Sequence, residues 1–339
     1  MDRSSRLRIG LIGSSDAIAG EVVKVLQERN FPVDELRVMV AGSSDRRRFL
    51  FHDRELPMVE IGASGFERLT AAVFLSSAET SHHYAAQAYQ SGAIIIDSTE
   101  HMRQMAKVPL VAPGLNEEAL IERPRMVAIP GALAMALASV LKPLHDLGEV
   151  TRIDATAILS AGGLGTAGVE ELNAQIKAVT SGRSIAPHVF PHQLAFNLVP
   201  ETDVFADSNH TRDELRTIVE LRKLIGNEAL QASITTVRAP IFLGDSISAR
   251  IALKERVEPD TARRLLAAAP GVKVLDDPAV SLYPQPWGAA GQDDVQVGRV
   301  RQDGSESRAL LLWISYDNVR RGIAIPTVQI LERLLDMRS

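Results

Sequence analysis

The amino-acid sequence predicts an α/β protein of two domains, the first a doubly wound parallel sheet and the second an α+β domain. Three observations lead to this prediction. A short apolar run ending in glycine opens the chain and precedes a helical segment. Further apolar runs then alternate with helical segments as far as residue 147. Beyond Gly148 the segments alternate apolar and polar residues, as strands with one buried face do. A length of 339 residues suits two domains.

The N-terminal segment has the order strand, glycine turn, helix. Residues 7–13 (LRIGLIG) form the expected strand, and residues 21–29 (EVVKVLQER) have the apolar spacing of a helix. This order opens a Rossmann-like unit, in which a nucleotide pyrophosphate lies at the helix N-terminus. The candidate cofactor-binding glycines are therefore Gly10, Gly13 and Gly20. The carboxylate of Asp16 in the same loop would repel a phosphate. Because a lone glycine-rich turn is also weak evidence, nucleotide binding stays open.

The next segments continue the alternation of strand and helix, which is typical of a parallel, doubly wound sheet. Strands are expected at 36–41, 71–76 and 93–98, and a helix at 83–91. The run from residue 126 to 129 is another short strand. It leads through Pro130 and Gly131 into an Ala- and Leu-rich helix, which Gly148 is expected to end.

The second domain is predicted from its β-rich segments. Strands are expected at 152–160, 233–243, 248–253 and 307–315, and helices at 168–180 and 211–224. In the last of these strands, Leu311 and Trp313 fall on one face and Leu312 and Ile314 on the other. Both faces need cover. We expect helices of the same domain to cover one face and a partner subunit to cover the other.

Composition and charge exclude several classes of protein. The formal net charge is −5 and the one concentrated basic run is Arg46–Arg48, so no nucleic-acid partner is predicted. No apolar run reaches about 18 residues and the N-terminus lacks the apolar core of a signal peptide, which predicts a cytoplasmic protein without membrane contact. The absence of cysteine rules out disulfides, thiolate metal sites and thiol catalysis. His82 and His83 are neighbours that would point apart on a helix, so no metal site is expected.

The helix that starts near residue 131 has the N-terminus that would stabilise an anion and lower the pKa of a cysteine, yet Gly131 and Ala132 stand there. Two segments resemble the aspartate-semialdehyde dehydrogenase family. VPLVAPGLN (108–116) is similar to the family's VPLVVPEVN, and AFNLVPETDVF (195–205) is similar to AFNVIPQIDVF. That family has an Asn-Cys pair at the positions of Gly131 and Ala132, and its cysteine forms a thioester with the substrate. The chain resembles most the family's Usg-type paralogues, which keep the domain plan without the cysteine.

The resemblance implies roles for four charged residues. Arg103 is similar to the arginine that binds the substrate's anionic group, and Arg238 to the arginine that holds the substrate carboxylate. Arg216 stands where the family has a lysine for the same anion as Arg103. Asp245 replaces the family's histidine acid–base, and the glutamine that orients the thioester is missing from residues 155–167. The competing interpretation is that the arginines are inherited without use.

The resemblance also implies NADP as cofactor, with Ser43 and Ser44 reading the adenosine 2′-phosphate. Pro326 stands in place of an asparagine that contacts the nicotinamide, and together with Asp16 it counts against a productive pose. NADP binding and its absence therefore both stay open, and no metal is implied.

The implied domains are residues 1–128 with 320–339, which bind the nucleotide, and residues 129–319, which bind substrate and form a homodimer. The last helix, 327–337, returns to the first domain.

The first functional hypothesis is a catalytically inactive homologue, with vestigial positions Ala132 and Asp245, that binds a small anion or a partner subunit, whether a second copy or an active relative. The alternative is an NAD(P)-dependent oxidoreductase that acts on an aldehyde or oxo group by non-covalent chemistry in amino-acid biosynthesis. In the first hypothesis the arginines share one cleft, which either takes an anion or is closed by Asp245 bridging Arg238.

Overall fold

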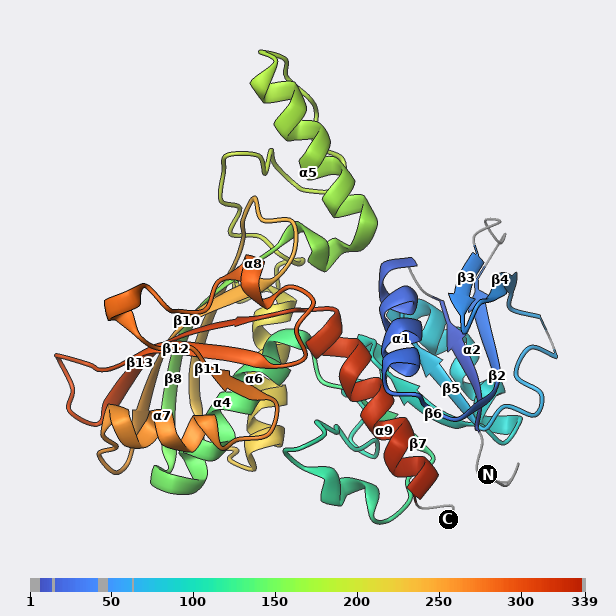
Figure 1. The fold of residues 1–339 in the computed structure, drawn as a ribbon, viewed down its shortest axis with the longest axis horizontal. Coiled ribbons are helices and arrows are strands. Elements are labelled where there is room, and N and C mark those ends of the chain that lie inside the picture. The colour runs from blue at the N-terminus through green and yellow to red at the C-terminus, as the bar shows by residue number, and fades with distance from the viewer. Residues whose placement is uncertain (1–6, 14–15, 42–47, 63, 337–339) are drawn as a thin grey trace. The chain divides into compact units, whose positions relative to one another are not determined.

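The computed structural model describes residues 7–13, 16–41, 48–62 and 64–336. The chain divides into two compact units, one formed by Met1–Gly131 with Ile323–Ser339 and the other by Ala132–Gly322 (Figure 1). The C-terminal helix belongs to the first unit, although the whole second unit separates it from the rest of that unit in the sequence.

The first unit is built on a seven-stranded sheet with the order β3-β4-β2-β1-β5-β6-β7. All neighbouring pairs are parallel except the β3–β4 hairpin at one edge. The strand order reverses between β1 and β5, which is the switch point where ligands bind in open α/β sheets. The strands are β1 (Leu7–Ile12), β2 (Val33–Val40), β3 (Arg48–Phe51), β4 (Arg54–Glu60), β5 (Ala71–Phe74), β6 (Ile94–Asp97) and β7 (Met126–Ala128).

The helices of the first unit are α1 (Asp16–Glu28), α2 (Ala78–Gln90), the single turn α3 (Glu100–Arg103) and α9 (Ile325–Asp336). α1 and α9 pack together, and Arg29 next to α1 donates to both carboxylate oxygens of Glu332 in α9, at 2.7 and 2.8 Å. α2 begins five residues before the predicted start at His83. Its N-cap is Ser77, whose hydroxyl accepts from the Thr80 N–H at 3.1 Å and so fixes the earlier first turn.

The second unit holds a six-stranded mixed sheet with the order β11-β12-β13-β10-β8-β9. β8–β9 and β11–β12 are parallel pairs, and the other pairs are antiparallel. The strands are β8 (Val150–Leu159), β9 (Gln231–Arg238), β10 (Asp245–Leu253), β11 (Val272–Val274), β12 (Val295–Gln302) and β13 (Ala309–Tyr316). The prediction of a parallel doubly wound domain followed by a second sheet domain is confirmed.

One face of the second sheet is covered by helices and the other is open. α4 (Ala132–Gly148) packs on β8 and β12, with α6 (Arg212–Ile225) and α7 (Pro259–Ala267) on either side of it. On β13, Leu310, Leu312 and Ile314 are buried, whereas Leu311 and Trp313 on the other face are partly exposed. The prediction that Leu311 and Trp313 share one face of the strand, and Leu312 and Ile314 the other, is confirmed.

α5 (Gly165–Thr180) projects from the second unit as an arm (Figure 1). A small core at its base joins α5 to the chain that returns along it. The Gln175 side chain in α5 also accepts from the N–H groups of Leu194 and Ala195, at 2.7 and 3.0 Å. The residues of this small core are Ala161, Leu172, Phe190, Leu194, Ala195 and Val199.

Every helix in the described part of the chain is too short or too polar to span a membrane. The same part of the chain includes no group of three or more His, Cys, Asp or Glu side chains placed to hold a metal ion.

Candidate functional site

The N-terminus of α4 follows β7 after a three-residue connection, as predicted. Its first turn starts at Ala132 and presents only Ala, Leu and Met side chains, so no nucleophile stands at the positive end of the helix dipole. Gly322 packs directly against this first residue, because a Cβ added to Gly322 would lie 2.4 Å from the Cβ of Ala132. The first residue of α4 therefore carries only a methyl group, and the backbone of Gly322 packs closely against it.

Asp245 is the first residue of β10 rather than part of a turn, and it is buried. Its Oδ1 accepts from both the N–H and the hydroxyl of Ser160, each at 2.8 Å. Burial raises the pKa of Asp245 to about 6, while the Ser160 hydrogen bonds and the charge of Arg238 act in the opposite direction. Tyr316 lies opposite in the β10–β13 pairing, and burial and the Asp245 charge raise the pKa of its phenol well above the ordinary value. A carboxylate held in this way is a structural acceptor more than an exposed base.

Arg238 ends β9 and is only 5% exposed. Its Nη1 donates to the Ser160 carbonyl at 2.7 Å and its Nη2 to the Thr202 carbonyl at 3.4 Å. Burial lowers the pKa of Arg238, and the charge of Asp245 counteracts this shift. No carboxylate of a described residue lies within 4.0 Å of this guanidinium. The alternative of a direct Asp245–Arg238 bridge is therefore wrong, because Ser160 lies between the two charges and forms hydrogen bonds with each.

A glycine is required beside Arg238. A Cβ on Gly163 would lie 2.8 Å from the Arg238 Nη1 and 3.4 Å from the Asn318 amide nitrogen. The Gly162-Gly163 pair was visible in the sequence, but nothing there indicated that the backbone passes against an arginine 75 residues further on. A side chain at position 163 would push the guanidinium away from the Ser160 carbonyl.

Arg216 lies on α6, and acidic side chains of the second unit neutralise its charge. It forms an ion pair with Asp203 and lies 3.9 Å from Asp213. Asp203 belongs to the segment AFNLVPETDVF that carried the resemblance, yet its pairing with an arginine thirteen residues later was not predicted. Because its charge is already balanced, Arg216 is a poorer anion receptor than Arg238.

Arg103 ends the α3 turn in the first unit, so it does not share a unit with Arg216 and Arg238. Its Nε donates to the Ile129 carbonyl at 2.7 Å, and its Nη2 donates to the Ser98 carbonyl. These carbonyls follow β7 and β6, so the side chain joins the ends of two neighbouring strands. Part of the guanidinium therefore has a structural task, and the expectation of one cleft shared with Arg238 stays a prediction.

The candidate nucleotide residues are distributed unevenly. Gly13 follows β1 at the switch point with φ +66°, and a Cβ there would lie 2.6 Å from the Ser76 Oγ. Gly10 lies within β1, where a Cβ would meet Leu69 at 2.7 Å, so its task is close packing of the sheet face. Gly20 is inside α1, and an added Cβ would meet nothing closer than 3.7 Å.

Gly13 thus fits the close turn of a phosphate-binding loop. Ser43 and Ser44 lie outside the described residues. Pro326 is buried in the first turn of α9 and has no backbone N–H, so it offers no amide donor to a nicotinamide.

Comparison with known proteins gives two matching family domains. Residues 8–123 match the family described as "Semialdehyde dehydrogenase, NAD binding domain", and residues 141–321 match "Semialdehyde dehydrogenase, dimerisation domain". The first range lies within the first unit and the second range within the second unit. Neither range includes the C-terminal helix α9.

Individual relatives match over nearly their whole length. The chain is 34% identical over 334 residues to the aspartate-semialdehyde dehydrogenase of Legionella pneumophila, covering 98% of this chain and 96% of the relative. It is 33% identical to that of Aquifex aeolicus, with 97% and 98% covered. Among solved structures, aspartate semialdehyde dehydrogenase II from Vibrio cholerae superposes with a TM-score of 0.94 at 29% identity, with 98% and 99% covered.

Proposed function

The chain belongs to the aspartate-semialdehyde dehydrogenase family, and from this premise we propose that it is a catalytically inactive homologue that binds a small anion, of the kind found among the Usg-type paralogues. The observation that carries the proposal is the N-terminus of α4. There the first residue is Ala132, in a chain without a single cysteine.

The chemistry of the family resemblance depends on a thiolate and an acid–base acting together. A methyl group has no electron pair to attack an aldehyde, so no thioester forms at Ala132. Asp245 is no substitute for the histidine, because its carboxylate is buried and accepts two hydrogen bonds from Ser160. When groups that act as a unit are removed together, little of the rate enhancement remains.

The proposed anion receptor is Arg238. A buried cation is costly unless it is paired, yet its hydrogen bonds in this structure go to two carbonyls and its counter-charge is separated from it by Ser160. A carboxylate that reached the guanidinium would form charge-assisted hydrogen bonds stronger than those to carbonyls. Arg216 is not part of the proposed site, because its charge is already paired with Asp203.

This anion site predicts a ligand-dependent stabilisation. Malonate or sulfate should raise the melting temperature progressively with concentration, since a ligand of the folded state stabilises by RT ln(1 + [L]/Kd), about 2.7 kcal/mol at 100 Kd. Arg238→Lys should remove most of the shift, because a lysine cannot reproduce the forked donors. The matched control is Arg212→Lys, an exposed arginine on α6. Equal shifts in both variants would contradict the site.

We also propose a homodimer formed through the second unit, which matches a dimerisation domain and has one face of its sheet open. The expected light-scattering mass at micromolar concentration is about twice the chain mass of 36.8 kDa. A mass that stays near 36.8 kDa up to about 100 µM would exclude the homodimer.

The second candidate function is an NAD(P)-dependent oxidoreductase without a covalent step. The observation that favours it is the tight Gly13 turn at the switch point, in a unit that matches an NAD-binding domain. Pro326 argues against a productive nicotinamide pose. Enhanced NADPH fluorescence that is lost in Gly13→Val, together with turnover of an aldehyde, would favour this candidate over the inactive homologue.

A further inference from the structure

The open face of the second sheet carries rows of aligned side chains. One row runs across five strands through Gly298, Trp313, Ser248, Thr156 and Thr235. Small hydroxyl side chains fill most of this row, so the indole of Trp313 stands above its neighbours. The face is therefore uneven, with one large aromatic group beside a strip of small residues.

A β-bulge in β12 interrupts the edge of this face. The pairing with β13 shifts between Gly298 and Arg301, and Arg299 within the bulge has φ +52°, which is strained for a residue with a side chain. The carboxylate of Asp276 holds this backbone, accepting from the N–H groups of Arg299 and Val300 at 2.7 and 3.0 Å. Arg263 in turn pairs with Asp276 at 2.6 Å. A partly buried ion pair, with the Asp276 carboxylate buried and Arg263 partly exposed, thus maintains a strained bulge.

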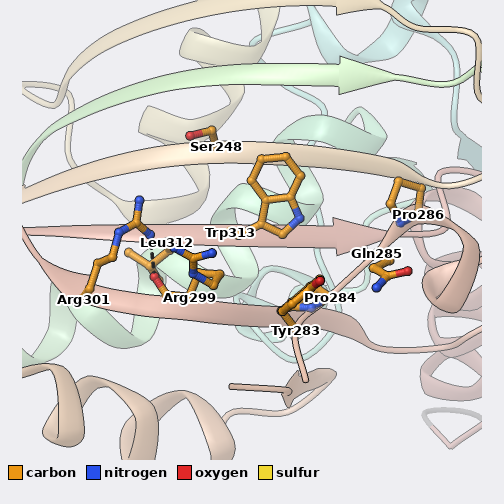
Figure 2. A pocket seen from close by; sticks show the side chains of 9 residues that line it. All are labelled: Ser248, Tyr283, Pro284, Gln285, Pro286, Arg299, Arg301, Leu312 and Trp313. Atoms are coloured by element: carbon orange, nitrogen blue, oxygen red, sulfur yellow. Dashed lines mark hydrogen bonds between the residues drawn. The ribbon is translucent and has the colours of Figure 1, made fainter. Parts of the chain in front are cut away.

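The bulge places two arginines beside a hollow of about 500 Å³. Figure 2 shows Arg299 and Arg301 at one end of this hollow, Trp313 in the middle, and Gln285 and Pro286 at the other end. Tyr283 and Pro284 complete the apolar wall. Neither arginine has a carboxylate of a described residue within 4.0 Å, and the Arg301 Nη1 donates to the Arg299 carbonyl at 2.7 Å. Neither positive charge is therefore neutralised by an ion pair with a described residue.

Trp287 stands next to the hollow and is 89% exposed. It lies on α8 (Pro286–Ala289), immediately after a residue that lines the hollow. The backbone of α8 is fixed from two sides: the Gln296 amide donates to the Gly288 carbonyl at 3.0 Å, and Gly244 packs so closely that a Cβ there would lie 2.3 Å from the Pro286 carbonyl oxygen. A projecting indole on a backbone fixed in this way is suited to act as an interface anchor.

We propose that Trp287 of one copy inserts into this hollow of a second copy, against Trp313 and the guanidinium groups of Arg299 and Arg301. The inference rests on the proposed homodimer and says which residues make it specific. Trp287 and the hollow are adjacent on the same chain. A two-fold axis that passes between them would place the Trp287 of each copy in the hollow of the other, which gives a closed pair of reciprocal contacts. Stacking of an indole on arginine and on a second indole gives both cation–π and aromatic contacts.

Two features of the surface favour a second copy over other occupants. The hollow opens on the sheet face of the unit that matches a dimerisation domain, so it is continuous with the expected contact. The net charge of −5 disfavours nucleic acid as the partner of the two arginines. A small organic anion would leave Trp287 exposed and is distinguished by the experiment below.

The test measures the dimer dissociation constant by sedimentation equilibrium. Trp287→Ala should weaken the dimer by about thirtyfold or more, as central aromatic anchors do. Ile121→Ala, which truncates a 72% exposed side chain in the other unit, is the matched control and should leave the constant unchanged. In the double variant with Arg301→Ala the losses should be non-additive, whereas Trp287→Ala with the exposed Arg308→Ala should be additive.

Fluorescence gives a second, independent result, because the chain has two tryptophans. In a Trp313→Phe background the emission of Trp287 should shift to shorter wavelength, and lose its quenching by iodide, as the protein is concentrated through its dissociation constant. A dimer as tight in Trp287→Ala as in Ile121→Ala, with Trp287 still quenched by iodide, would overturn the inference and leave the homodimer standing. A chain that is monomeric at every concentration would overturn both.

Discussion

The protein should produce no NADPH from aspartate semialdehyde, NADP and phosphate, and Ala132→Cys should not restore useful activity. The new thiol would stand at the N-terminus of α4, where the helix dipole favours a thiolate. It would still lack a proton donor and acceptor, because Asp245 is buried and bonded to Ser160. We expect activity at least about a thousandfold below that of a family dehydrogenase, since nucleophile and acid–base act as a unit.

The measurement is the increase in absorbance at 340 nm, with the Legionella pneumophila relative assayed in parallel as the active reference. A matched pair of variants sharpens the result: Ala132→Cys alone, and Ala132→Cys with Asp245→His. The double variant should exceed the single one, while the close contact of Gly322 with position 132 limits both. Activity of the single variant within tenfold of the reference would refute the assignment of Asp245 as a non-functional replacement.

Most of the fold could be predicted because its strands carry strong local patterns. LRIGLIG, AAVFLS and AIIIDS are short buried runs, and each forms a strand at nearly the expected residues. The β3–β4 hairpin was missed because its residues are mostly exposed and show no continuous apolar run. β12 was missed for a different reason: its bulge breaks the period-two alternation on which the prediction of a strand depends.

The candidate site was predicted in its residue types and not in its connections. The sequence singled out Arg238 and Asp245, but the residue that joins them is Ser160, 78 and 85 positions away. Long-range partners of this kind depend on the pairing of β8, β9 and β10, which no local pattern specifies. The neutralisation of Arg216 by Asp203 could not be predicted for the same reason, because the two residues belong to different segments of the chain.

Asp245→Asn should stabilise the protein at neutral pH and have little effect in mild acid. The folded protein raises the pKa of Asp245 from 3.8 to about 6, chiefly by burial. A group whose folded pKa is raised contributes stability that is fully present below pH 3.8 and is lost as the pH rises through 6. A shift of about 2 units corresponds to roughly 3 kcal/mol, the upper limit of the loss.

The asparagine variant keeps an oxygen that can accept from Ser160 and has no proton to lose. The free energy of unfolding, measured with urea from pH 4.5 to 7.5, should therefore fall for the natural protein relative to Asp245→Asn by about 2 kcal/mol. Asp303→Asn is the control, because contacts with Ser305 and Arg250 lower the pKa of Asp303 from 3.8 to about 2. The pKa values of Asp303 in the unfolded and folded states thus both lie below the measured pH range. The difference in unfolding free energy between the natural protein and Asp303→Asn should therefore not change with pH. A flat difference for Asp245→Asn as well would mean that the Ser160 hydrogen bonds and the Arg238 charge fully offset the effect of burial on the pKa of Asp245.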